Sequence, residues 1–333
     1  MSVTNYSSLD TGAPRNGALT GRLIDVLRDI LVGALVTGYG SEPAAGWTLA
    51  HNHADGFTLG NGLGYINFVH YSNNAVEMYL LDSLSDTSTA LVTGVNRRSY
   101  RWSDSNPGGA RHGIYTGAIS SSYTAEMWSV VADNKTAIVQ IAGVNGGVDT
   151  AAAAAQLGMY FGQLQGLVGP INVILGGSGA SVASGFSDGG MLNLGTCSRN
   201  PLDGTVSQGT DCSYAVEALR TGSAGSETAR NVAPANTSMR PTRVGMRALG
   251  TVIAGSTSSS YSVFSGLLRG VLMDPGSSDY QPSVVLKLLG KSSPVPTDRI
   301  TPIALPSGRQ VVPMFGAAGD LKCLVSLAEE DWV

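Results

Sequence analysis

The residues whose spacing comes nearest to a reactive site are two histidines and an aspartate in the run HNHAD, residues 51–55. Alternate side chains of a β-strand point the same way, so His51 and His53 could face one metal ion with the carboxylate of Asp55 nearby. A protein metal site needs three or four ligands, and the chain's 4 histidines form no second cluster of this kind. Ordinary surface or loop histidines explain the run better, and we expect no bound metal.

A glycine-rich stretch, Gly176–Ala180, follows an expected strand and comes nearest to a phosphate-binding loop. Such a loop continues into a helix with a Lys-Ser or Lys-Thr pair, and neither follows here. No G-x-S-x-G motif lies between an expected strand and an expected helix, so no serine nucleophile can be assigned. We interpret the stretch as a loop and expect no cofactor.

Paired carboxylates could cleave glycosidic bonds if two of them lined a cleft. Four acidic residues lie near expected strands or turns, namely Glu77, Asp82, Glu126 and Asp133. Any β protein offers as many, so they assign no catalytic pair, and we expect the chain not to be an enzyme.

Aromatic side chains could instead form a platform for a sugar ring. The candidates are Trp47, Trp102, Trp128, Tyr65, Tyr79 and Tyr100. Because these residues follow the periodicity of strands, burial in a core explains them better than exposure.

The chain is poor in ionised side chains. Of its 333 residues, 13% are Asp, Glu, Lys or Arg, against about 25% in an ordinary soluble domain. Much of its polarity comes from small neutral residues, and its 43% hydrophobic content argues against disorder. Such a surface suits burial against other proteins.

The formal net charge is −4, and Arg97-Arg98 is the only adjacent basic pair, so no footprint for nucleic acid is present. The start lacks the pattern of a signal peptide and no run of 18 apolar residues follows, so no membrane insertion is expected. Cys197, Cys212 and Cys323 lack CxxC spacing. Free thiols are expected, with a Cys197–Cys212 disulfide as the alternative.

One amphipathic helix is expected from Leu19 to about Val36, after a polar arm that ends at Asn16. Thr20 is the expected N-cap, and Gly38 ends the helix where a left-handed residue is favoured. The apolar positions recur at helical spacing: Leu23, Leu27, Ile30, Leu31 and Ala34. This face should pack into the core. The alternative is that the helix docks on a neighbouring subunit, with the arm reaching across the interface.

Beyond Pro43, short apolar runs separated by Gly, Asn, Asp and Ser predict antiparallel strands. Two hairpins stand out, one pairing Gly64–Tyr71 with Ala75–Leu81 and one spanning Ala125–Ala142. A helical turn is expected at 150–156, and long loops or a weakly packed insertion at 176–238. Short apolar elements are expected at 159–164 and 171–175, and further strands at 244–254, 261–273, 284–289, 303–305, 311–315 and 321–327. The C-terminus directly follows the last of these strands, so we expect it to be anchored and Trp332 to be packed.

Together these patterns predict a mainly β fold, with antiparallel sandwich-like sheets, one N-terminal helix and an extended N-terminal arm. The expected organisation is an arm and helix at 1–40, a β-rich domain at 41–175, a Gly/Ser-rich loop region at 176–238, and a C-terminal β-rich part at 239–333 that packs with 41–175.

The run Leu27–Trp47 resembles an element of uncharacterised structural proteins of tailed bacteriophages, in which a helix leads into V-x-G-[YF]-x-x-x-P-A-A-G-W-T. Here that stretch is Val36–Thr48. The section after it, with Asp86–Ala90, the hairpin WSVVADNKTAIVQI and a C-terminal LRG before a strand pair, also looks similar. The likeness is diffuse beyond Val139. It implies a tail or baseplate component of the virion and transfers no catalytic residue.

The expected function is therefore a non-enzymatic virion subunit, made in the host cytoplasm, that binds copies of itself and other phage proteins. Candidate contact regions are the arm, the stretch Gly176–Ser238 and the loop around Ser103–Arg111. Alternatives are a receptor- or glycan-binding module at the tail tip that binds a host surface receptor, a capsid decoration protein, and an enzyme that cleaves surface polysaccharide.

Overall fold

The computed structural model describes residues 2–16, 19–99, 102–103, 112–115, 125–143, 157–175, 195–199, 204–206, 215–219, 240–247, 262–273, 300–304, 308–315 and 321–332. This part of the chain is mainly β, all of its strand pairs are antiparallel, and it contains one α-helix. The predicted fold class is confirmed. The expected helical turn at 150–156 and the expected strand at 284–289 lie outside the described residues.

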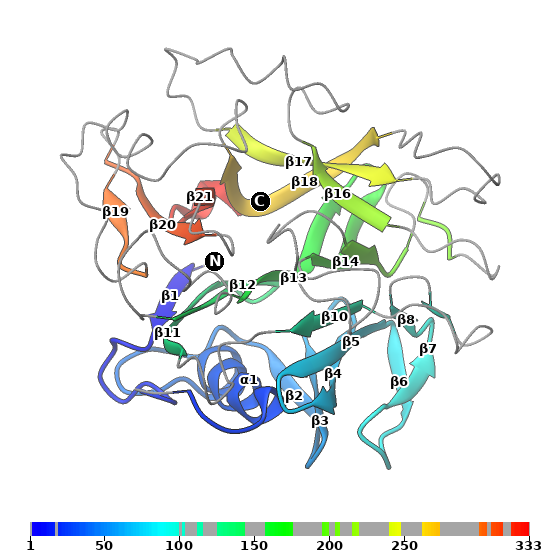
Figure 1. Ribbon diagram of the computed structural model, residues 1–333. Coiled ribbons are helices and arrows are strands. Elements are labelled where there is room, and N and C mark those ends of the chain that lie inside the picture. The colour runs from blue at the N-terminus through cyan, green and yellow to red at the C-terminus, as the bar shows by residue number, and fades with distance from the viewer. Residues whose placement is uncertain are drawn as a thin grey trace, which may run out of the picture.

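The smaller of the two main sheets forms one layer of the sandwich (Figure 1). Its strands in sheet order are β2 (Thr48–His53), β3 (Gly56–Gly60), β4 (Tyr65–Ser72), β5 (Ala75–Leu81), β8 (Arg98–Ser99) and β9 (Trp102–Ser103), with β10 (His112–Tyr115) also paired to β5. A separate hairpin, β6 (Ser83–Asp86) and β7 (Thr93–Val95), follows β5. Tyr65 and Val69 of β4 pack in an apolar cluster with Val92.

The larger sheet continues from the sandwich into a ring of strands. In sheet order it contains β1 (Thr4–Ser7), β11 (Ala125–Ala132), β12 (Thr136–Gly143), β13 (Leu157–Gly166), β14 (Gly169–Leu175), β15 (Gly195–Cys197), β16 (Ala215–Leu219), β17 (Arg240–Arg247), β18 (Ser262–Met273), β21 (Leu321–Ser326), β20 (Gln310–Phe315) and β19 (Ile303–Ala304). Strand β18 also pairs with β13, opposite Leu164–Gly166, so the strands from β13 to β18 close on themselves.

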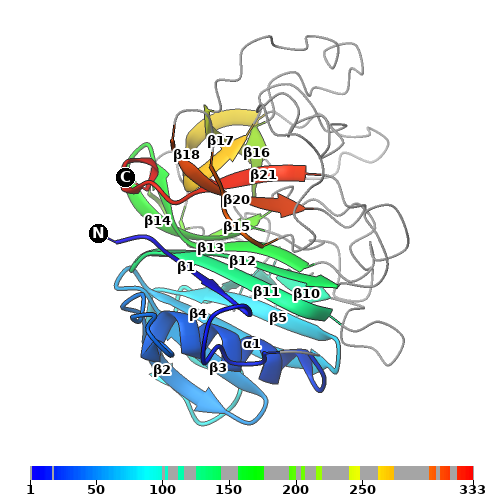
Figure 2. The same cartoon turned by 90° about the vertical axis from the view of Figure 1, so that its left-hand side faces the viewer.

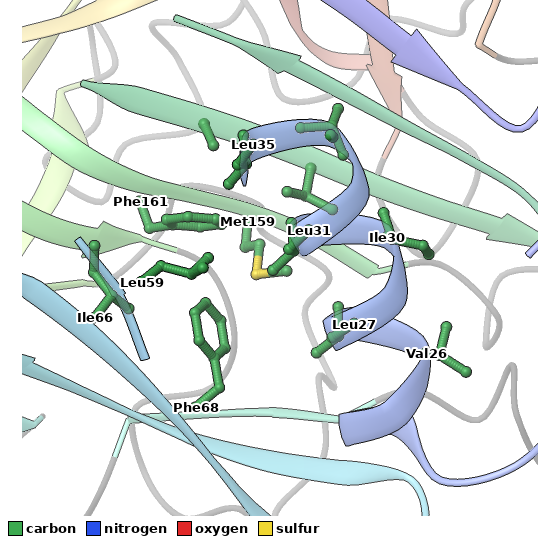
Figure 3. Packing of buried hydrophobic residues seen from close by; sticks show 14 of the residues in the cluster. Val26, Leu27, Ile30, Leu31, Leu35, Leu59, Ile66, Phe68, Met159 and Phe161 are labelled. Atoms are coloured by element: carbon green, nitrogen blue, oxygen red, sulfur yellow. The ribbon is translucent and has the colours of Figure 1, made fainter. Parts of the chain in front are cut away.

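Helix α1 (Leu23–Val32) fills the space between the two sheets, and a π-helical turn, Gly33–Thr37, extends it. Figure 3 shows its apolar face pointing toward Leu59, Ile66 and Phe68 of the smaller sheet and toward Met159 and Phe161 of the larger one. The expected packing of this face into the chain's own core is confirmed.

The predicted start of the helix is wrong by four residues. Arg22 is the N-cap, without a side-chain hydrogen bond, in place of the expected Thr20. Gly21 stands between Thr20 and the helix with a φ of 105°, so the chain turns before the helix begins. The first helical N–H, that of Leu23, donates to the carbonyl oxygen of Asn73 in the β4–β5 turn at 2.6 Å. The predicted end is confirmed, since Gly38 has a φ of 70°.

Both predicted hairpins are present, as β4–β5 and β11–β12. Their turns are short and rich in Asn, Asp and Ser, whose side chains accept hydrogen bonds from nearby backbone N–H groups. In the β11–β12 turn, Asp133 Oδ1 accepts from the N–H of Lys135 at 2.9 Å and of Thr136 at 2.8 Å. Local sequence therefore fixes each of these strand pairs.

The N-terminal arm is extended, as expected, and it packs against its own chain. Strand β1 pairs with β11, and Tyr6 is fully buried with its hydroxyl donating to the carbonyl oxygen of Pro43 at 2.7 Å. Burial raises the pKa of Tyr6 to about 12. Val3 packs with the apolar cluster that contains Trp332, so the two ends of the chain lie close together (Figure 2).

The larger sheet draws strands from all four expected parts of the chain. β1 lies in 1–40, β11 to β14 lie in 41–175, β15 and β16 lie in 176–238, and β17 to β21 lie in 239–333. Residues 176–238 thus contain two short strands of the larger sheet, where long loops or a weakly packed insertion were expected. Among the described residues, no helix combines the length and apolar character needed to cross a membrane.

Candidate functional site

The histidine run lies on the edge strand β2 and does not form a metal centre. The rings of His51 and His53 stack with their centroids 6.2 Å apart, as alternate residues of a strand should. Asp55 instead pairs with Arg22, with 2.6 Å between Oδ1 and Nη1. Within the described ranges, no three His, Cys, Asp or Glu side chains are placed to hold a metal ion.

The acidic candidates are dispersed and engaged within the chain. Glu77 is buried and accepts a hydrogen bond from the hydroxyl of Tyr79 at 2.5 Å. Asp82 pairs with Arg199, with 2.6 Å between Oδ2 and Nη2. Asp133 is fully buried and belongs to a separate group of polar residues, described below. The side chain of Glu126 lies outside the described residues.

The aromatic candidates whose side chains are described belong to the interior. Trp47 is 3% exposed, Trp128 0% and Tyr79 1%, and Tyr65 packs partly buried beside Tyr79. Burial in a core is therefore confirmed for these residues. The side chains of Trp102 and Tyr100 lie outside the described residues.

Several further candidates also fall outside the described part of the chain. These are Gly176–Ala180 and most of the loop around Ser103–Arg111. The thiol of Cys197 is free and buried, and burial raises its pKa.

Within the described part of the chain, the β11–β12 turn at Asp133 makes polar contacts with several distant segments. Asp133 itself is 0% exposed. Its carbonyl oxygen accepts the indole N–H of Trp47 at 2.8 Å. The next residues of the turn reach the smaller sheet, because Asn61 Nδ2 donates to the carbonyl oxygen of Lys135 at 2.8 Å. The turn therefore bonds to both layers of the sandwich.

Arg269 supplies the countercharge for Asp133 from strand β18, across 136 residues of sequence. Its Nη2 lies 2.6 Å from Asp133 Oδ2, and the two side chains are 4% and 0% exposed. The Nη1 group donates to Thr136 Oγ1 at 3.0 Å, and Nε donates to the carbonyl oxygen of Trp332 at 2.6 Å. A buried charge pair is tolerated when its hydrogen bonds are satisfied in this way.

The C-terminal residues close over this centre. The indole N–H of Trp332 donates to the carbonyl oxygen of Ser326 at 2.8 Å, and its ring is 2% exposed. The ring lies against Gly270, where an added Cβ would come within 2.3 Å of it. The expected packing of Trp332 is confirmed, and the reason is that Gly270 leaves it space.

A second polar link joins the two sheets beside the turn. Asn61 Nδ2 also donates to Asn172 Oδ1 at 2.8 Å, and both asparagines are 3% exposed. Lys135 Nζ donates to the carbonyl oxygen of Asn61 at 3.1 Å. Arg269, the turn and this amide pair thus connect the smaller sheet, the larger sheet and the C-terminus.

The chemistry of this centre is structural. Tyr160 donates its hydroxyl hydrogen to the carbonyl oxygen of Gln163 and accepts the N–H of Arg269 at 3.2 Å. Burial raises the pKa of Tyr160, which keeps it neutral. Both oxygens of Asp133 and the guanidinium of Arg269 are occupied by groups of the same chain. We therefore interpret this centre, formed by Asp133, Thr136, Arg269 and Trp332, as a structural clamp.

One residue in the sequence indicates a buried ion pair at this place, although the overall composition does not reveal it. Arg269 is the one charged residue in the apolar strand SVFSGLLRGVLM. A charge in such a run demands a buried partner. Nothing in the sequence identifies which of the chain's acids that partner is.

A second group of charges holds the start of helix α1. Arg22 bonds to Asp25 at 2.8 Å and to Asp55, and Arg28 bonds to Asp25 and, at 2.7 Å, to the carbonyl oxygen of His53. Hydrogen bonds from Arg22 lower the pKa of Asp25 and of Asp55. These charges bind the start of the helix to the end of β2 and the turn after it.

No protein-family model matches the chain, and no curated protein matches it either.

Proposed function

We propose that this chain is a non-enzymatic structural subunit of a bacteriophage particle, in the tail or baseplate, that assembles with copies of itself and with other virion proteins. The proposal rests on the low charge content of the chain, of which 13% of the residues are Asp, Glu, Lys or Arg. Some of these charges also lie in the interior, as in the Arg269–Asp133 pair, whose side chains are 4% and 0% exposed.

With so few ionised residues in the chain, we expect much of its surface to be neutral. Neutral surface loses little on leaving water, because few ionised groups must be desolvated when it is covered. A rigid clamp at the centre suits the same role, since a subunit must present its contact surfaces in a fixed arrangement. The resemblance of Val36–Thr48 to tailed-phage virion proteins favours the tail or baseplate.

The test is to find the chain in the particle. Antibodies raised against the purified protein would be applied to particles of the phage that encodes it, and the particles would be examined by electron microscopy and mass spectrometry. We expect several copies at one symmetric position. A label on the head would favour a decoration protein, and a label at the fibre tip with binding to host glycans would favour a receptor-binding module. A stable monomer that is absent from particles would overturn the proposal.

A further inference from the structure

The N-terminal arm lies in a site on the rest of the chain that receives it along its length. Strand β1 pairs with Ser129–Ala132 of β11 at the edge of the larger sheet (Figure 2). The ring of Tyr6 is fully buried, and its hydroxyl donates to the carbonyl oxygen of Pro43. We call the surface that receives residues 3–14 the arm site.

The far end of the arm site is shaped for the end of the arm. The carbonyl oxygen of Pro14 accepts the indole N–H of Trp128 at 3.0 Å. Gly33 lies against the Pro14 ring, so an added Cβ would come within 2.9 Å of Pro14 Cγ. Between the two ends, the hydroxyl of Tyr39 donates to Asp10 Oδ2 at 2.9 Å. Because every copy of the chain carries both the arm and the arm site, the arm of a second copy fits this site equally well.

The chain bends at Arg15, directly after the arm. Arg15 has a φ of 52°, a backbone conformation that residues other than glycine adopt at a cost. Asn16 is exposed, whereas Leu19 is buried in the core, so the arm can swing at Arg15 and Asn16 without disturbing the core. Strain at such a hinge favours exchange of the segment beyond it, because an extended hinge relieves the strain and the exchanged segment keeps its contacts.

An exposed ion pair holds the hinge in its bent form. Arg15 Nε lies 2.7 Å from Asp29 Oδ2, and the two side chains are 30% and 47% exposed. Exposed pairs of this kind contribute little to stability. The hinge can therefore open at a small cost, provided that the arm finds another arm site.

We propose that two copies of this chain exchange their arms, so that residues 3–14 of each copy occupy the arm site of the other. The exchanged contacts are those seen within one chain, and reciprocal exchange gives the self-complementary contact that a two-fold dimer requires. In dilute solution each chain keeps its own arm, because the connection holds the arm near its site at an effective concentration of roughly millimolar. Exchange is favoured where copies lie side by side, as in a particle. This inference rests on the proposed assembly role.

A disulfide between β1 and β11 reports which copy supplies the arm. Ser7 and Ser129 lie opposite each other in that pairing, and both are buried. The double variant Ser7→Cys/Ser129→Cys would be oxidised when dilute and when concentrated, and then run on a non-reducing gel. We expect an internal disulfide in a monomer when dilute, and a linked dimer when concentrated. Each single variant is the control for bonds to the native cysteines and should give no dimer.

The ion pair at the hinge gives a second test that leaves the arm site intact. Asp29→Asn removes the partner of Arg15, so we expect the dimerisation constant from sedimentation to rise, by up to about fivefold for each arm. Asp86→Asn is the matched control, because Asp86 is an exposed carboxylate on β6, away from the arm (Figure 1), and should leave dimerisation unchanged. A dimerisation constant that stays the same in Asp29→Asn, or that rises equally in the control, would count against exchange at this hinge.

Particles that contain the double variant separate arm exchange from the assembly role. Linked dimers in oxidised particles would support exchange. Internal disulfides alone, or as much dimer in a single variant, would overturn exchange while the assembly role stands. If the chain is absent from particles but still forms linked dimers when concentrated, exchange stands and the assembly role is wrong. If the chain is absent from particles and monomeric at every concentration, both are wrong.

Discussion

At the level of single residues, Arg269 and Asp133 form a buried ion pair with 2.6 Å between Nη2 and Oδ2. Both side chains are almost fully buried, so removal of one leaves the other as an uncompensated charge in the interior. Loss of one partner of a buried pair costs roughly 3–5 kcal/mol. We expect Arg269→Met to lower the free energy of unfolding by about that amount in urea denaturation.

Arg15→Met is the control, because the Arg15–Asp29 pair is on the surface, with side chains 30% and 47% exposed. Exposed pairs contribute roughly 0–1 kcal/mol. Equal losses in the two variants would show that the Arg269 pair is no more important than a surface pair.

Gly270 provides a second test at this scale. An alanine there meets the Trp332 ring at 2.3 Å and must also adopt a φ of 70°. Gly308 has a φ of 85° with nothing near an added Cβ, so Gly308→Ala suffers the backbone strain alone, about 1 kcal/mol. We expect Gly270→Ala to lower the melting temperature clearly more than Gly308→Ala, and to expose Trp332 to a fluorescence quencher. Similar melting temperatures would contradict the close packing of Trp332.

The sequence predicted part of this residue-scale arrangement. The Asp-Asn-Lys run correctly marked Asp133 as a turn residue, since such a role depends on neighbours along the chain. The partner of Asp133 is 136 residues away, and no spacing rule links the two. A lone Arg269 in an apolar strand signals only that some partner exists.

At the scale of elements, hairpins were predicted well and the helix start was not. Hairpin registers follow from turn chemistry and alternating side chains, which are local properties. The helix start depends on Asn73, 50 residues from Leu23 in sequence, whose carbonyl oxygen accepts the first helical N–H. Leu19 is 1% exposed and so fits an apolar pattern, although it precedes the helix.

The charges at the helix start predict a pH dependence. Arg22 lowers the pKa of Asp25 and of Asp55 in the folded chain, so their contribution is fully present above the unfolded pKa of about 3.9. It is lost as pH falls through the lower, folded pKa values. We expect Arg22→Met to be less stable than the wild type at neutral pH, by a modest amount because these side chains are partly exposed.

Urea denaturation of both proteins from neutral pH to about pH 3 provides the measurement. The difference in unfolding free energy should shrink as the carboxyls become protonated, and added salt should reduce it at neutral pH. A difference that stays constant down to the acid limit would mean that Arg22 acts through packing or its bond to the Ala54 carbonyl oxygen, at 2.8 Å, and not through the two acids.

At the scale of the whole molecule, the β class and sandwich follow from composition and strand patterns, but closure of the ring does not. Strands β13 and β18 pair although about 100 residues separate them, and either could satisfy its edge with another strand. The expected boundaries at 175 and 239 came from a change in composition. Composition does not reveal the hydrogen bonds that join strands on either side of those boundaries.

The pairing of β13 with β18, together with the clamp, predicts how the molecule unfolds. Because Arg269 joins β18 to the β11–β12 turn and to the C-terminus, strands β11 to β14, β18 and β21 should open together. We expect hydrogen exchange, followed by mass spectrometry in low urea, to give one common opening free energy for peptides from β11 to β14, β18 and β21. The β6–β7 hairpin lies outside both main sheets and should exchange sooner.

The Arg269→Met variant separates the two possible sources of this coupling. If the clamp carries it, β18 and β21 should exchange at a lower free energy than β11 to β14 in the variant while matching them in the wild type. If strand pairing alone carries it, the variant should lower every segment equally. Wild-type protein in which β18 and β21 open well before β11 to β14 would mean that the C-terminal part folds independently, as a division near residue 239 would require.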